Sequence, residues 1–383
     1  MAHTDTQSFT LLCTSDIHGH IYPTDYQSRQ IKHLGLAKLA AMIRQERERD
    51  PQLLLIDNGD LLQGTPLMHH FVKYNRSGIH PAIMTLNHLG YNAAVLGNHD
   101  FNYGLEILRQ AVHDSAFPWL SANIIDSRTR QPAFGQPYLI RQIRQEAKVA
   151  ILGLTTHFIP QWEIPEFIHG LTFIDALSAA KKWVELIRNV EKPDVMIISY
   201  HGGLERDPDT GEAVEALSGE NQAYAMCTEL EGVDVLLTGH QHQLLTDEVN
   251  GVTILQPGCN GLALGKVSIQ LVKRKEAWMI AQKTASLILT NETVQPDIQI
   301  MKLTERHEQQ TQVWLDRPIG EVFDHAPLQD PLSAGLSDHP FMDDMSPDQL
   351  DATASGLTRG AVLTSDSPES GSSVTMRDII FDY

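Results

Sequence analysis

The residues of this sequence whose types could carry out chemistry occur in short polar clusters within the first two thirds of the chain. The clusters are Asp16-Ile17-His18, Gly59-Asp60, Gly97-Asn98-His99-Asp100, His201-Gly202-Gly203 and Gly239-His240-Gln241-His242. Their Asp, His and Asn side chains offer the oxygen and nitrogen donors that bind divalent metals. Closed structural zinc sites usually contain thiolates, and the clusters contain no cysteine, so the pattern favours a catalytic metal site.

The spacing within the clusters is suited to holding two metals. Asp16 and His18 are two residues apart, so an extended backbone would direct both side chains to the same side, and His240 and His242 repeat this spacing. Asp60 follows a glycine, which suits an exposed carboxylate that approaches two ions. Two metals about 3.5 to 4 Å apart need such a bridging carboxylate. Because the chain has 18 histidines, the prediction rests on the order and position of the clusters.

Each cluster follows an apolar run that is typical of a buried strand, and strand ends of an α/β sheet converge on a ligand. The predicted strands are Phe9 to Ser15, Leu53 to Asn58, Ala93 to Leu96, Val149 to Leu154, Val195 to Tyr200 and Val235 to Thr238. Helical patterns lie between them, at Gly35 to Arg47, Tyr103 to Val112 and Asp175 to Val190, the last with Asp175 as its N-cap. This alternation of strand and helix predicts an α/β fold.

The last part of the chain changes in character. Three β-like runs, which we expect to complete a second sheet, are Thr253 to Gln256, Lys266 to Leu271 and Met279 to Leu289. The acidic stretch Gly202 to Gly219 is either a solvated loop or a mobile flap beside the site. Asp297 to Leu315 is amphipathic and predicts one helix, which ends before Pro318.

Composition excludes several classes of function. With 383 residues and 42% hydrophobic content, the chain is long enough for two folded domains. Its net charge of -19 argues against duplex nucleic acid as a partner. Three cysteines without zinc or redox spacing argue against a disulfide framework. We expect a monomer with no membrane span, cytoplasmic as given because no secretion signal is present, or secreted or periplasmic if a signal was removed.

Longer motifs around the clusters resemble a known family. These motifs are Thr14 to His20, Asp57 to Pro66 and Leu89 to Gly104. They are similar to the calcineurin-like metallophosphoesterases, and within them to the 5'-nucleotidase and 2',3'-cyclic-nucleotide 2'-phosphodiesterase branch. The resemblance implies a four-layer αββα sandwich over residues 1–295, a connector helix over 296–318, and over 319–383 the amino-terminal fragment of an α+β carboxyl domain. We expect the rest of that domain, which stacks the nucleobase in the family, to be missing from this sequence.

The resemblance also implies which residues hold each metal. One ion would be bound by Asp16, His18, Asp60 and His242, and the other by Asp60, Asn98, His201 and His240. Manganese and zinc are the expected ions, with cobalt, iron, magnesium and calcium as alternatives.

His99 would then contact the phosphate and stabilise the developing charge or the leaving oxygen. In the 5'-nucleotidases this motif resembles G-N-H-E-F-D, whose last residue orients the histidine, whereas this chain has Asn102 there. An amide can hold the ring but cannot stabilise an imidazolium as a carboxylate does. Asp100 is the alternative partner of His99. The motif is closer to the G-N-H-E-F-N of the cyclic phosphodiesterases.

The function we expect from this resemblance is hydrolysis of nucleotide esters by a dinuclear metal site, as a 2',3'-cyclic-nucleotide 2'-phosphodiesterase and 3'-nucleotidase. Two metals lower the pKa of a bound water toward neutrality, so no protein nucleophile is required. A nucleotide or cyclic nucleotide is the expected substrate. Two alternatives remain open: a 5'-nucleotidase or UDP-sugar hydrolase, and a metal-binding protein on the same fold without catalysis.

Overall fold

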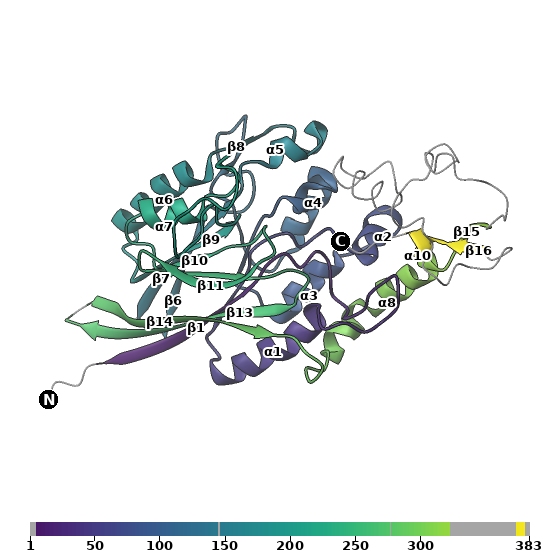
Figure 1. The fold of residues 1–383 in the computed structure, drawn as a ribbon, viewed down its shortest axis with the longest axis horizontal. Coiled ribbons are helices and arrows are strands. Elements are labelled where there is room, and N and C mark those ends of the chain that lie inside the picture. The colour runs from purple at the N-terminus through teal and green to yellow at the C-terminus, as the bar shows by residue number, and fades with distance from the viewer. Residues whose placement is uncertain (1–4, 145, 276, 322–372, 380–383) are drawn as a thin grey trace.

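The computed structural model describes residues 5–144, 146–275, 277–321 and 373–379, and two six-stranded sheets form its centre (Figure 1). The first sheet has the strand order β14 (Ala277–Leu289), β13 (Ala263–Arg274), β1 (Thr6–Thr14), β2 (Leu54–Asp57), β3 (Ala93–Val95) and β4 (Trp119–Leu120). The second has the order β11 (Leu244–Val249), β12 (Val252–Pro257), β10 (Val235–Leu237), β9 (Val195–His201), β7 (Ala147–Thr155) and β6 (Tyr138–Ile143). Neighbouring strands from β1 through β2 and β3 to β4 are parallel. Neighbouring strands from β7 through β9 and β10 to β12 are parallel as well.

Apolar side chains pack on both faces of each sheet. Between the sheets, Leu11 and Ile56 of the first share a buried cluster with Ile151 and Ile197 of the second. A second cluster joins the first sheet to the helices α1 (Leu36–Arg49), α2 (Pro66–Tyr74), α3 (Pro81–Leu89), α4 (Gly104–Asp114) and α8 (Ile298–Leu315). A third joins the second sheet to α6 (Ala176–Val190) and α7 (Ala223–Glu229), which lie on the opposite outer side in Figure 1. Burial on both faces explains why these strands are continuous apolar runs, and the α/β class is as predicted.

The prediction that the last three β-like runs complete the second sheet is wrong for two of them. β13 pairs antiparallel with β1, and β14 pairs antiparallel with β13, so both extend the first sheet. Only β12 joins the second sheet, parallel to β10. Along β13, buried residues alternate with partly or fully exposed ones, as expected for an antiparallel strand with one solvated face.

Two helices begin after an aspartate N-cap, and the cap at Asp175 is as predicted. Asp175 accepts a hydrogen bond from the backbone N of Ser178 at 2.8 Å, and α6 begins at the next residue. Asp297 accepts from the backbone N of Gln299, also at 2.8 Å, and α8 follows it. Each cap satisfies a helix N–H that has no partner within the helix, which fixes where the helix begins.

The helix that was predicted as a connector packs against the first sheet's helices. Trp314 and Leu315 of α8 lie in the same buried cluster as α1 and α3. After α8, β15 (Pro318–Glu321) pairs with β16 (Ser373–Thr375), and α10 (Met376–Ile379) follows. Arg377 donates to Asp316 Oδ1 at 2.9 Å and to Gln312 Oε1 at 2.7 Å. Most of the carboxyl fragment predicted over 319–383 lies outside the described residues.

Short elements complete the described part of the chain. They are η1 (His99–Phe101), β5 (Ile124–Asp126), α5 (Ile159–Trp162), η2 (Pro165–Ile168) and β8 (Leu171–Phe173). Within the ranges given above, no helix combines the length and the apolar character that crossing a membrane requires.

Candidate metal centre

The predicted metal ligands lie at the carboxyl ends of strands from both sheets. Asp16, Asp60 and Asn98 follow β1, β2 and β3 of the first sheet, while His201 is the last residue of β9 in the second. The segment with His240 and His242 follows β10 in that second sheet. Parallel strands end at the same edge of a sheet, so the facing edges of the two sheets bring these loops together.

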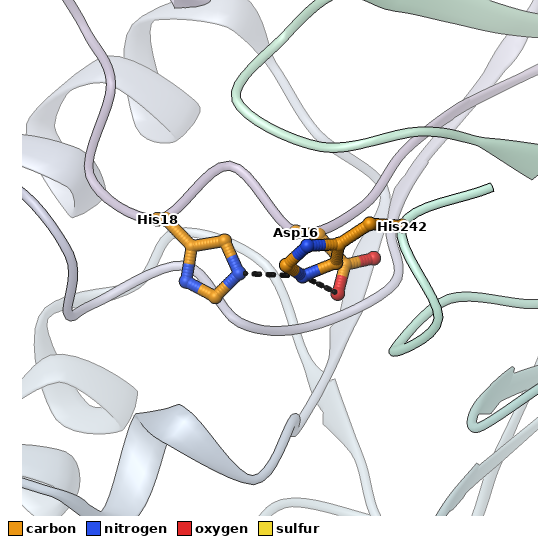
Figure 2. Close-up of side chains that lie close together, drawn as sticks. All are labelled: Asp16, His18 and His242. Carbon is orange, nitrogen blue, oxygen red and sulfur yellow. Dashed lines mark hydrogen bonds and ion pairs between the residues drawn. The ribbon is translucent and has the colours of Figure 1, made fainter. Parts of the chain in front are cut away.

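A first group of donors consists of Asp16, His18 and His242, and Figure 2 shows their side chains directed toward one another. The Nε2 atoms of His18 and His242 are 3.0 Å apart. The Nε2 atom of His242 is 3.5 Å from Asp16 Oδ1, and that of His18 is 3.9 Å from Asp60 Oδ2. These atoms are candidates for holding one ion, because two imidazoles and two carboxylates are a suitable ligand set for a divalent cation.

A second group surrounds His201. Its Nε2 is 3.2 Å from Asp60 Oδ2, 3.1 Å from Asn98 Oδ1 and 3.9 Å from Asp16 Oδ1. The ring of His240 lies 5.7 Å from the ring of His201, measured between centroids. Asp60 therefore contacts both groups, which is the position that a bridging carboxylate would occupy.

The backbone of this site is held in an unusual conformation. Five of the predicted ligands have left-handed φ angles: Asp16 at 53°, His18 at 47°, Asp60 at 56°, His240 at 68° and His242 at 57°. Such a conformation costs a non-glycine residue about 1 to 3 kcal/mol and persists where the surroundings enforce it, most often at functional sites. A Cβ atom on Gly97 would lie only 2.1 Å from Asp60 Oδ1, so the close approach of these loops requires glycine there.

Burial and mutual attraction set the charges of the donors. Burial alone would raise the pKa of Asp60, but His201 and His99 hold it well below its usual range. Burial would likewise lower the pKa of His201, yet Asp60 and Asp16 raise it to about 10. Burial lowers the pKa of His18 to about 3, so this imidazole is neutral at pH 7. The carboxylates of Asp16 and Asp60 are ionised, since the pKa of each is lowered, and a divalent cation would replace the proton on His201.

Partners behind the ligands fix which ring nitrogen faces the site. The Nδ1 of His201 lies 2.7 Å from the carbonyl oxygen of Asn58, so its Nε2 is left for a metal. The Nε2 of His240 lies 2.8 Å from Glu220 Oε1, which leaves Nδ1 as the ring nitrogen for a metal. Partners of this kind orient metal-bound histidines and set their tautomer. Glu220, which directly follows the acidic stretch 202–219, was not found by sequence reasoning, because no motif marks it.

The two residues proposed as alternative partners of His99 have different contacts. Asn102 Oδ1 lies 2.7 Å from His99 Nδ1, so Asn102 holds the ring. The carboxylate of Asp100 instead accepts hydrogen bonds from the backbone N atoms of Gly97, Asp60, Leu61 and Leu62, at 2.8, 3.1, 2.9 and 2.9 Å. A buried carboxylate needs such donors, and this one joins the loop of Asp60 to the loop of Asn98. The position of Asp100 therefore supports a structural role.

A further carboxylate reaches His99 indirectly. The Nδ2 of Asn102 donates to Glu163 Oε2 at 2.8 Å, and Glu163 is 8% exposed. Glu163 comes directly after α5 and is 61 positions away from Asn102 in the sequence. Sequence reasoning missed it because neither its spacing nor a motif connects it to the clusters.

The chain is similar to known proteins in both sequence and fold. The family described as calcineurin-like phosphoesterase matches residues 9–244. The trifunctional nucleotide phosphoesterase YfkN of Bacillus subtilis is 29% identical over 82% of this chain and 23% of its own length. A solved structure of YfkN has a TM-score of 0.73 at 27% identity and covers 81% of this chain and 99% of that one.

Two other relatives carry different names. A 2',3'-cyclic-nucleotide 2'-phosphodiesterase/3'-nucleotidase of Salmonella typhimurium is 28% identical over 84% of this chain and 53% of its own length. A 5'-nucleotidase of Vibrio cholerae is 32% identical over 54% of this chain and 36% of its own length. The chain thus spans about half the length or less of these relatives. Because the family match covers more than half of the chain, this protein belongs to the calcineurin-like phosphoesterase family.

Proposed function

We propose that this protein uses two divalent metal ions to hydrolyse phosphoric esters of nucleotides, and that 2',3'-cyclic nucleotides and 3'-nucleotides are its substrates. The observation that carries the proposal is the position of Asp60, whose carboxylate faces both donor groups while its Oδ1 accepts from the backbone N of His99 at 2.7 Å. Asp60, the proposed bridge between the two ions, therefore also holds the backbone of His99, the residue proposed to lie beside the phosphate.

Manganese or zinc would fit these nitrogen and oxygen donors. Asp16, His18, Asp60 and His242 would hold one ion, and Asp60, Asn98, His201 and His240 would hold the other. When bound, the two ions would supply a water of lowered pKa and neutralise charge on the phosphate.

The protein's own contribution to the chemical step is His99. Its Nδ1 faces Asn102, so Nε2 is the ring nitrogen left to face an ester. In opening a 2',3'-cyclic phosphate, the oxygen of water bonds to phosphorus, the bond from phosphorus to the ribose O2' breaks, and O2' takes a proton. His99 would donate that proton as a general acid. The product is a 3'-monoester, and a second hydrolysis at the same site would release phosphate.

Two observations favour the cyclic substrate. Asn102 takes the place of an orienting carboxylate, as in the cyclic-phosphodiesterase motif, and the Salmonella relative carries that activity in its name. The 5'-nucleotidase of Vibrio cholerae supports the second candidate, hydrolysis of 5'-monoesters. We propose the domain division at 1–295, 296–318 and 319–383 on the same resemblance, with the metal-binding residues all in the first part.

The test combines metal analysis with kinetics. We expect protein saturated with manganese or zinc to hold two ions per chain and to hydrolyse 2',3'-cyclic AMP and 3'-AMP with higher kcat/KM than 5'-AMP. The His99→Asn variant should keep both ions and lose about 10²- to 10⁴-fold in kcat, the contribution of a positioned acid. His113→Asn, at a side chain that is 81% exposed, is the control.

Three results would count against the proposal. Two bound ions without turnover of any ester would favour a metal-binding protein without catalysis. A higher kcat/KM for 5'-AMP would favour the 5'-nucleotidase. Loss of metal in the His99→Asn variant would make His99 a ligand.

A further inference from the structure

The side chain of Glu163 is joined to His99 by the amide of Asn102. Asn102 presents Oδ1 to His99 Nδ1 at 2.7 Å and donates through Nδ2 to Glu163 Oε2 at 2.8 Å. The three residues thus form a continuous line of hydrogen bonds from the interior to the ring beside the donor groups.

Glu163 determines which way round the amide of Asn102 lies. An ionised carboxylate only accepts hydrogen bonds, so the atom of Asn102 that faces it must be the NH₂ group. The oxygen of the amide must then face His99, and an oxygen can only accept. His99 Nδ1 therefore keeps its proton in both the neutral and the charged ring, and Nε2 is the nitrogen that takes up a proton and gives it to the leaving oxygen.

The surroundings hold Glu163 in place. Its backbone N donates to the carbonyl oxygen of Ile159 at 2.9 Å, which closes the turn at the end of α5. Its Oε1 accepts from the backbone N of Ile164 at 2.9 Å, so both carboxylate oxygens have a partner. Neither of these contacts is with a cation, and burying a carboxylate without one costs free energy. Such a cost is expected where the fold or the function requires the acid.

We propose that Glu163 is a positioning residue for His99, and that it acts by fixing the orientation of the Asn102 amide and hence the tautomer of the ring. This inference rests on the proposed function, because it assigns His99 the role of proton donor to the leaving oxygen. Asn102 thereby orients His99 in place of a carboxylate. The acid, Glu163, acts on the ring through the amide of Asn102.

The substitution Glu163→Gln tests the inference with little change in volume. A glutamine side chain can accept or donate, so it allows Asn102 to turn over and present NH₂ to His99. We expect kcat for 2',3'-cyclic AMP to fall by about ten-fold, part of what a positioned acid contributes, with KM and metal content unchanged. Glu166→Gln, at an exposed residue of η2, is the matched control.

The second substitution, Asn102→Asp, separates positioning from a structural role. Alone, it places two carboxylates at the 2.8 Å distance of Asn102 and Glu163, and we expect lower activity because one of them must take up a proton. Combined with Glu163→Gln, the aspartate can only accept from His99, whichever way the glutamine lies. The double variant should therefore be more active than either single variant.

A spectroscopic readout makes the result independent of turnover. Nitrogen-15 spectra of the zinc-loaded protein, recorded at a pH where the ring of His99 is neutral, should show its Nδ1–H tautomer in the wild type, a mixture in Glu163→Gln, and the Nδ1–H form again in the double variant. Wild-type kcat in Glu163→Gln, or a double variant no better than the worse single one, would overturn the inference. Absence of turnover in the wild type would refute the proposed function alone, since the tautomer can still be read.

Discussion

Replacing Asp100 by asparagine should weaken both the fold and the metal site, although Asp100 is not among the expected ligands. Its Oδ2 accepts from the backbone N atoms of Gly97 and Asp60, and its Oδ1 from those of Leu61 and Leu62. An asparagine has one oxygen, so its NH₂ group must face one of the two pairs of N–H donors. Whichever way the amide lies, two hydrogen bonds to a carboxylate are lost.

The magnitude follows from these contacts. Hydrogen bonds to charged groups contribute about 1.5 to 3 kcal/mol each, so losing two of them costs roughly 3 to 6 kcal/mol of unfolding free energy. That is a large part of the 5 to 15 kcal/mol typical of a folded protein. The same contacts hold the loop of Asp60 against the loop of Asn98, so we also expect affinity for the metals to fall by about 10- to 100-fold, as for other residues behind a ligand.

Urea unfolding of the metal-free protein measures the first effect, and titration with manganese or zinc measures the second. Asp209→Asn, at an exposed position of the acidic stretch, is the control and should match the wild type in both. An Asp100→Asn variant that unfolds at the wild-type urea concentration would refute the argument from hydrogen bonds. An unstable variant with wild-type metal affinity would show that Asp100 does not position the two loops.

Three further predictions concern single carboxylates. Asp60→Asn should lower the affinity for both ions, because its oxygens face both donor groups, and selective loss of one ion in metal analysis would contradict the bridge. Glu220→Gln should lower the affinity for one ion by about ten-fold, because the carboxylate orients His240, with Glu212→Gln as the exposed control in the same titration. Burial raises the pKa of Asp57 to about 8, so its contribution to stability is fully present below about pH 4 and is lost as the pH rises through 8. Asp57→Asn should flatten this decline in urea midpoints measured from pH 4 to 9, and parallel curves would show that Asp57 is not its source.

The sequence predicted the buried strands and the helix capped by Asp175 with little error. The run Leu53 to Asn58 contains the observed β2, and the helix predicted from the cap at Asp175 is the observed α6. Both depend on local properties, namely a continuous apolar run between two packed layers and a side chain that accepts from a helix N–H. The sheet to which β13 belongs was not predictable in this way. Its pairing with β1 joins residues far apart in the chain, and its alternating burial suits a strand with one solvated face in either sheet.

The functional site likewise contains residues that the sequence could predict and residues that it could not. Asp16, Asp60 and His201 could be found because each lies at or just after the end of a strand, and the ends of parallel strands meet at one edge of a sheet. Glu163 could not be found, because it lies 61 positions from its partner and becomes relevant only once α5 brings it to Asn102. The choice between Asp100 and Asn102 as partner of His99 also needed coordinates, since both are close to it in sequence.

Two acids beside the site, Asp100 and Glu163, have their carboxylates directed at protein hydrogen-bond donors. Asp100 is surrounded by backbone N–H donors, and Glu163 by the amide of Asn102 and the backbone N of Ile164. Hydrogen bonds to an ionised carboxylate stabilise its charge where water is absent. For the proposed function, a chain with a net charge of -19 must nevertheless accept a phosphate ester. Because Asp16 and Asp60 are the carboxylates that face the donor groups directly, two divalent ions there would reverse the local charge, and the acids behind them would orient ligands without repelling the phosphate.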